Sequence, residues 1–170
     1  MKKTLFTLLL MLLSAVAINA QSLTGKEWCT IMADEDGENI AMAMSFEKSG
    51  SCEIVLALQQ EMKEDGVPIT ILAGLTIPGT YTLNDKDLKI DLNKEKAKAE
   101  IDYEIKGMDA KTKAMMDKVI KSELDGLKDE FKKEMFKGMP NMSNLKIATL
   151  ESKRLVVTNS DNQEITFYSK

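Results

Sequence analysis

The side chains that could do chemistry in this chain are carboxylates, thiols and thioethers, because the sequence contains no histidine. Histidine is the commonest general base and the commonest metal ligand in proteins. Its absence excludes Ser-His-Asp and Cys-His catalysis and zinc sites with histidine ligands. The acidic residues lie mostly in turns and on the polar faces of predicted strands, where carboxylates are usually solvated. We therefore predict a protein without enzymatic activity and without a cofactor. A hydrolase with a carboxylate pair ranks third among the function classes.

Three methionines near the C-terminal third of the chain, Met135, Met139 and Met142, offer soft thioether ligands. Such ligands suit Cu(I). However, Met135 continues the apolar stripe of a predicted helix, and methionine is a flexible filler of irregular cores. We favour the packing role and predict no metal site.

The two cysteines, Cys29 and Cys52, lie in consecutive predicted strands. In an up-down-up meander over residues 22–62, Cys29 is expected beside Met42, and Met42 beside Ala57. Cys52 then lies about 16 Å along the strand from that point. A disulfide spans at most about 7 Å between Cα atoms. This register predicts two thiols and no intramolecular bridge.

Most of the chain from residue 22 to residue 105 has apolar residues at every second position. The clearest run is Ala97, Ala99, Ile101, Tyr103 and Ile105, which alternates with charged residues. This period predicts strands with one buried and one wet face. Turn-type residues separate the runs, which indicates short antiparallel connections. These turns are predicted at Asp34–Gly37, Lys48–Ser51, Glu64–Gly66, Pro78–Gly79 and Asn84–Asp85, and the first three strands at 22–32, 38–47 and 52–62.

The period changes to three and four residues after Asp109 and predicts one helix over 109–137. Asp109 is a suitable N-cap, and Gly138 with Pro140 ends the helix. Gly126 in the middle allows a kink. The predicted apolar stripe contains Met115, Met116, Val119, Ile120, Leu124, Leu127, Phe131 and Met135.

Three more strands are predicted after the helix, at 145–150, 154–158 and 163–168. We therefore expect one mainly β domain over 21–170. Its fold is expected to be an antiparallel up-and-down barrel of about 8–10 strands, with the helix inserted before the last three. Barrel closure removes exposed sheet edges.

The N-terminus has the order of a secretory signal peptide over residues 1–20. Lys2 and Lys3 precede an apolar run, and the small residue Ala20 precedes Gln21. The run is about 14 residues long, which is short of the roughly 20 needed to span a bilayer. We expect cleavage after Ala20, export to the periplasm or the extracellular space, and no membrane span in the mature protein.

The formal net charge of −4 disfavours binding to phosphate backbones. The predicted helix carries interleaved lysines and acids, which also disfavours anionic membranes. We therefore expect no nucleic-acid partner, and a protein partner stays unspecified.

Several short motifs are similar to exported lipocalin-like domains of Gram-negative bacteria. The mature chain opens with Leu23-Thr24-Gly25-Lys26-Glu27-Trp28, continues with Gly79-Thr80-Tyr81 and Leu88-Lys89-Ile90, and ends in a hairpin over 154–168. The Gly-to-Trp spacing is one residue longer than the usual lipocalin signature, and three strands rather than one follow the helix. The resemblance implies a calycin-type β-barrel in which Trp28 plugs the closed end.

Two non-enzymatic functions follow from this expected fold. The first is an exported protein that holds a small apolar ligand inside the barrel, with the helix as a lid. The alternative is a barrel packed by its own side chains that binds another protein through its outer face or helix. The candidate ligand contacts, all on the predicted inward face, are Trp28, Met42, Met44, Phe46, Ile54, Leu56 and Ile71.

Overall fold

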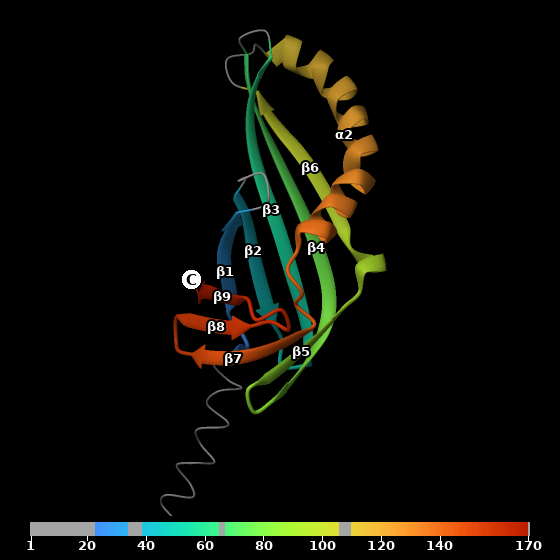
Figure 1. The fold of residues 1–170 in the computed structure, drawn as a ribbon. Helices are drawn as coiled ribbons and strands as arrows, with labels where there is room; N and C mark the ends of the chain where they lie inside the picture. Colours follow the sequence, from blue (N-terminus) through green and yellow to red (C-terminus); the bar gives the residue numbers. More distant parts are fainter. Residues whose placement is uncertain (1–22, 34–38, 65–66, 106–109, 170) are drawn as a thin grey trace, which may run out of the picture.

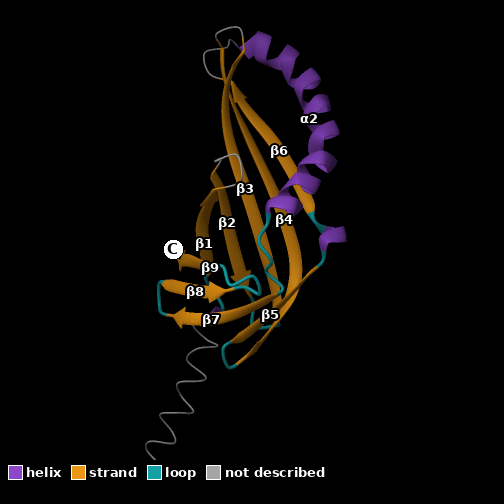
Figure 2. Cartoon of the chain, in the orientation of Figure 1, coloured by secondary structure: helices purple, strands orange, loops and turns teal. Residues whose placement is uncertain are grey.

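The structure is a computed structural model that describes residues 23–33, 39–64, 67–105 and 110–169. These residues contain nine strands, the long helix α2 (Ala110–Gly138) and the short 3-10 helix η1 (Lys94–Lys96), as Figures 1 and 2 show. The strands are β1 (Glu27–Ala33), β2 (Asn39–Phe46), β3 (Ser51–Glu64), β4 (Val67–Asn84), β5 (Asp87–Leu92), β6 (Lys98–Ile105), β7 (Asn144–Leu150), β8 (Arg154–Thr158) and β9 (Glu164–Ser169).

Eight of these strands close into an antiparallel barrel. The order around it is β3-β2-β1-β9-β8-β7-β5-β4, and a direct pairing of β3 with β4 completes the circle. The chain is therefore mainly β, with α2 before the last three strands, which confirms the predicted fold class. The predicted turns at Lys48–Ser51 and Asn84–Asp85 are also confirmed, with positive φ at Gly50 and Asp85.

The predicted turn at Pro78–Gly79 is wrong, because β4 runs through both residues without a break. On one side β4 pairs with the whole of β3, from Val67 to Thr80. On its other side it pairs first with β6 and then with β5. Pro78 lies where these two partners are separated by η1, and its carbonyl accepts the N–H of Asn93 at 2.8 Å. A proline is tolerated there because the neighbouring ladder is interrupted.

Beyond the barrel, β1, β2, β3, β4 and β6 continue as an open five-stranded sheet (Figure 1). β1 pairs with β9 only at Trp28 and Cys29, so its later residues lie at an edge of this sheet. The other edge is β6, and α2 packs along the same side as the barrel interior. We call the face that looks toward α2 and the barrel interior the inner face, and the opposite face the outer face.

The registers of the β1–β2 and β2–β3 hairpins each differ by one residue from the predicted ones. Cys29 lies opposite Ala43 instead of Met42, and Met42 lies opposite Leu56 instead of Ala57. The physical reason is that side chains alternate between the two faces of a strand, so a shift of one residue in the register changes which side chains face each other across the sheet. Only the observed register places Trp28 opposite Met44 with both side chains on the inner face.

The helix begins at Ala110, so the predicted N-cap Asp109 and the loop 34–37 lie outside the described residues, as does part of Glu64–Gly66. α2 continues through Gly126 as one curved helix (Figure 1). Leu124 and Met135 are buried as predicted, whereas Leu127 is 49% exposed. In the described part of the chain, neither α2 nor any other helix is both long and apolar enough to cross a membrane.

Candidate functional site

The closed part of the barrel contains six of the seven predicted ligand contacts. Their side chains all point to the inner face because they occupy alternate positions of β1, β2 and β3. Each has an exposed fraction of 1% or less. These six residues are Trp28, Met42, Met44, Phe46, Ile54 and Leu56. Their role as ligand contacts stays a prediction.

The low exposure of these side chains also shows how closely they pack inside the closed part of the barrel. A void large enough for a water molecule would add exposed area to the side chains around it. The inward residues of the opposite strands, including Leu88, Leu155 and Phe167, are 0% exposed as well. The largest inward side chains of the closed part are therefore buried against one another in a single core.

Trp28 anchors one end of this core. Its indole Nε1 donates a hydrogen bond to the carbonyl of Leu23 at 3.0 Å, so the buried polar atom has a partner. The ammonium of Lys26 lies 5.4 Å from the ring centroid, within the range of a cation–π contact. Trp28 is thus a buried core residue with a satisfied hydrogen bond, and its role as a plug at the closed end stays a prediction.

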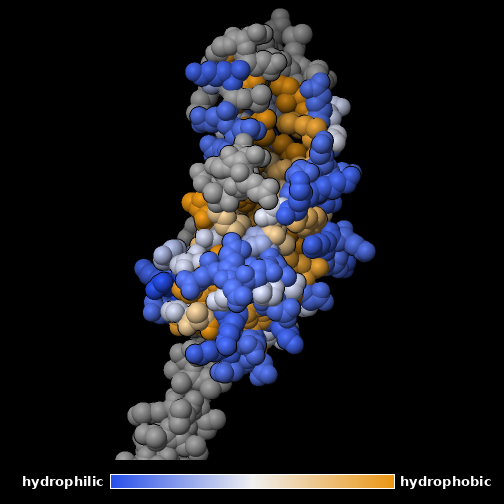
Figure 3. Space-filling model, viewed as in Figure 1, coloured by the Kyte–Doolittle hydropathy of each residue, from blue (hydrophilic) through white to orange (hydrophobic). Residues whose placement is uncertain are grey.

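The seventh predicted contact, Ile71, lies elsewhere on the inner face. It belongs to the open sheet and is half-buried, opposite Gln60 and Tyr103. Leu58 and Ile101 share this half-buried state on the same face. Figure 3 shows apolar atoms between the hydrophilic surface of α2 and the long strands. The inner face therefore divides into a packed part and a part that solvent reaches.

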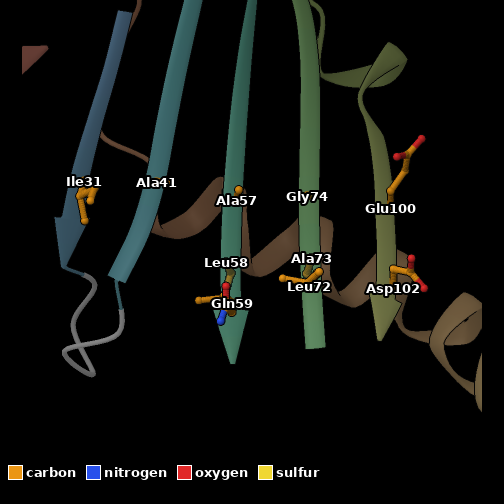
Figure 4. A pocket seen from close by; sticks show the side chains of 10 residues that line it. All are labelled: Ile31, Ala41, Ala57, Leu58, Gln59, Leu72, Ala73, Gly74, Glu100 and Asp102. Carbon is orange, nitrogen blue, oxygen red and sulfur yellow. The ribbon is translucent and has the colours of Figure 1, made fainter. Parts of the chain in front are cut away.

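The outer face of the open sheet carries a second apolar surface, which the sequence analysis did not identify. One row crosses the sheet at right angles to its strands, and each member lies opposite the next in the strand register. Figure 4 views this row with α2 behind the sheet. The row consists of Ile31, Ala41, Ala57, Gly74 and Glu100.

Small side chains at the centre of this row leave a groove of about 490 Å³, which we call the outer groove. Leu72 and Asp102 stand beside the row and also line it. A second hollow of about 610 Å³ adjoins it over β1 and β2, and includes Cys29, Val55 and Tyr168. The two hollows share Ile31, Ala41 and Ala57, so they form one continuous surface.

Large apolar side chains surround this surface without being covered. Ile31 is 72% exposed, Tyr168 60% and Leu72 44%. Among the described residues, only Leu127 joins them as a large, exposed apolar side chain. Isolated exposed apolar residues need no explanation, but a contiguous group of them marks a binding surface.

A signal for this surface was present in the sequence. The segment Ile40–Phe46 alternates large apolar residues with Ala41 and Ala43, and β3 places Val55 and Ala57 in the same way. A solvated outer face normally carries polar residues at such positions. The interpretation of these strands as half-wet missed that both of their faces are apolar.

The charged residues that line the two hollows are all acidic. Glu100 and Asp102 lie at the β6 end of the outer groove, and Glu27 lies in the adjoining hollow. One oxygen of Asp102 accepts the backbone N–H of Tyr103 at 2.9 Å, which fixes the orientation of the carboxylate. Lys98 precedes Glu100 on the same face of β6 but does not line the groove.

The two cysteines lie on opposite faces and are not joined by a disulfide. The Cys29 thiol donates to a carboxylate oxygen of Glu27 at 3.3 Å on the outer face. Cys52 is buried on the inner face, and burial together with the charge of Asp91 raises the pKa of its thiol to about 11. Burial, with Cys52 and Glu47 nearby, also raises the pKa of Tyr81.

We expect the two thiols to differ strongly in reactivity at pH 8. Cys29 should react with a thiol reagent in the native protein, whereas Cys52 should react only after unfolding because it is buried and protonated. The folded pKa of Cys52 lies above the unfolded value of 9.0. Its contribution to stability is therefore complete below pH 9 and is lost as the pH rises toward about 11.

Thiol titration with and without denaturant measures this difference, and Cys29→Ser provides the control that should remove the native reaction. Equal native reaction rates for Cys29 and Cys52 would contradict the burial of Cys52. Cys52→Ala should show a smaller loss of stability between pH 9 and 11 than the unmodified chain.

The three methionines considered as copper ligands belong to the core. Met135 and Met142 are buried within the main apolar cluster, and Met139 packs against it. Within the described residues, no group of three or more cysteine and acidic side chains is placed to hold a metal ion.

The fold and the packed interior together define a small β-barrel protein that is consistent with a lipocalin-like fold. Comparison with protein-family models and with curated proteins found no match to this chain. The resemblance to lipocalin-like domains is therefore supported by the architecture of the barrel and by no matching family model or curated protein.

Proposed function

We propose that this chain is a non-enzymatic protein-interaction module that binds another protein through the outer face of its open sheet. The observation that carries the proposal is the continuous apolar surface around Ile31, Ala57 and Leu72, which the described part of the chain leaves uncovered. The burial of the inward side chains supports the same conclusion, because the large exposed apolar side chains Ile31, Leu72 and Tyr168 lie on the outer face. We also propose that the protein is exported, because residues 1–20 have the order of a signal peptide. Mass spectrometry of the protein from its native host should then find a mature chain that begins at Gln21.

Two neighbouring residues of β4 test this proposal, since Ile71 points to the inner face and Leu72 to the outer face. A photo-crosslinking amino acid at position 72 is expected to form an adduct with one identifiable protein in the native host, and the same group at position 71 is not. The purified partner should then bind the unmodified chain and lose at least about tenfold in affinity with Leu72→Lys. Ile71→Lys is the matched control.

Adducts at position 71 but not at position 72 would contradict the proposal. So would a purified partner whose affinity is unchanged by Leu72→Lys. Crosslinking at position 71 alone would place the binding surface on the inner face instead.

A second candidate function is the carriage of a small apolar ligand on the inner face beneath α2. The half-buried state of Leu58, Ile71 and Ile101 favours it, because solvent reaches apolar side chains there. An apolar fluorescent probe read on the same pair of variants distinguishes the two functions. Probe binding that Ile71→Lys removes and Leu72→Lys preserves would support the carrier.

A further inference from the structure

The floor of the outer groove cannot pair with an extended peptide. Ala41, Ala57 and Gly74 lie on strands that pair with neighbours on both sides at these positions. Their backbone groups are therefore already engaged in the sheet. An extended segment lying across the strands would leave its own N–H and C=O groups without partners, at a substantial cost. An α-helix satisfies its backbone internally and brings only side chains to the groove.

The dimensions of the row also suit a helix. Ile31 and Glu100 lie on the two edge strands of this five-stranded sheet, four strand intervals apart, which is roughly 19 Å at the usual spacing between strands. A helix covers this distance with about 13 residues. The rows on either side lie two residues away along the strands, so they are roughly 13–14 Å apart. A helix with its side chains is about 10–12 Å wide.

Gly74 gives an independent indication that another backbone approaches this floor. Its φ is not in the left-handed region, and a Cβ added to it would meet only the carbonyl oxygen of Leu56 at 3.9 Å, an ordinary contact. The fold therefore has room for a side chain at this position. Glycine in a strand interior weakens the strand, and it often marks a place where a ligand or a second backbone comes close.

Charge and shape indicate that the occupant is a different protein. Glu100 and Asp102 are acidic, and this end of the groove favours a lysine or arginine, or the positive N-terminal end of a helix. A second copy of this chain would present the same shallow floor of small side chains and the same acidic end. Two such floors facing each other would leave the space between them unfilled.

We propose that the outer groove binds an amphipathic helix of another protein, an inference that rests on the proposed function as an interaction module. Its large apolar side chains fill the space above Ala41, Ala57 and Gly74, and its positively charged end lies over Glu100 and Asp102. This is the helix-in-groove mode of recognition, with anchors at i, i+3, i+4 and i+7.

Two labelled probe peptides of about 13 residues test the occupant. Both carry leucines at the anchor positions, and one has lysines at its N-terminal end where the other has glutamates. The unmodified chain is expected to bind the lysine peptide at least about tenfold more tightly, as measured by fluorescence anisotropy. The double substitution Glu100→Lys and Asp102→Lys should reverse this preference. Glu130→Lys, on the exposed surface of α2, is the control and should preserve it.

Gly74→Val fills the groove floor and separates loss of binding from loss of folding. We expect at least about tenfold weaker binding of the lysine peptide, with an unchanged or higher midpoint of thermal unfolding because valine favours strands. Equal binding of both peptides to the unmodified chain would overturn the proposed helix. Self-association that Gly74→Val abolishes would identify a second copy as the occupant and overturn it as well. The crosslinking at position 72 judges the interaction surface separately from these results.

Discussion

Replacing Trp28 with alanine is expected to lower the free energy of unfolding by about 3–5 kcal/mol, the usual cost of removing a large aromatic side chain from a core. Trp28 is 0% exposed and lies opposite Met44 in the strand register. Its removal leaves a cavity and also removes the hydrogen bond to the Leu23 carbonyl. Unfolding should be followed by far-ultraviolet circular dichroism in urea, because the chain has one tryptophan and the variant has none.

Leu127→Ala is the matched control for this experiment, since it also shortens a large apolar residue but at a position that is 49% exposed. Its effect should lie within about 0.5 kcal/mol. A similarly small effect of Trp28→Ala would show that the residue does not belong to a packed core. The closed part of the barrel would then have space for a small apolar ligand, which is the first of the two functions expected from the sequence.

The second large effect is expected for Gly79→Ala, which should destabilise the barrel by about 1–3 kcal/mol through overpacking. A Cβ at this position would lie 2.6 Å from the carbonyl oxygen of Asp91 and 3.2 Å from the Cα of Leu92. Both are backbone atoms of β5, so the clash cannot be relieved by turning a side chain. β4 and β5 would have to separate where β4 passes from one partner strand to the other.

Gly74→Ala, in the same strand, is the control for Gly79→Ala. The added methyl group meets no atom closer than 3.9 Å, so the change should stabilise the chain by about 0.5–1 kcal/mol, as alanine is less flexible than glycine when unfolded. Urea unfolding of both variants measures the contrast. Destabilisation of similar size at both positions would mean that backbone freedom, rather than steric contact with β5, requires the glycines.

Much of the fold followed from local patterns. Alternation identified the inward set of β1 to β3, which the structure confirms with Met44 and Ile54 as buried residues. The change of period after residue 109 located the helix before the last three strands. The predicted register was wrong by one residue because it rested on the expected centres of the turns. The inward direction of Trp28 and Met44 was the stronger constraint.

Other features depend on contacts between residues distant in the sequence. Pro78 and Gly79 have the composition of a turn, yet β4 continues through them because β3 pairs along its full length. Ile71 has the same pattern as Leu75, but only Leu75 belongs to the main core cluster and is fully buried. Neither result can be read from the residues within one strand.

By itself, the sequence determined where most of the strands lie, which of their side chains share a face, and where the helix lies, because the periods of two and 3.6 residues are local properties of the backbone. The tertiary structure alone decided which of those faces is covered. α2 lies on the inner side of the open sheet, and the opposite side, with Ala41, Ala57 and Gly74, has no covering element among the described residues. Covering a face requires another segment to pack on it, and that is settled by the long-range closure of the barrel rather than by the pattern of any one strand.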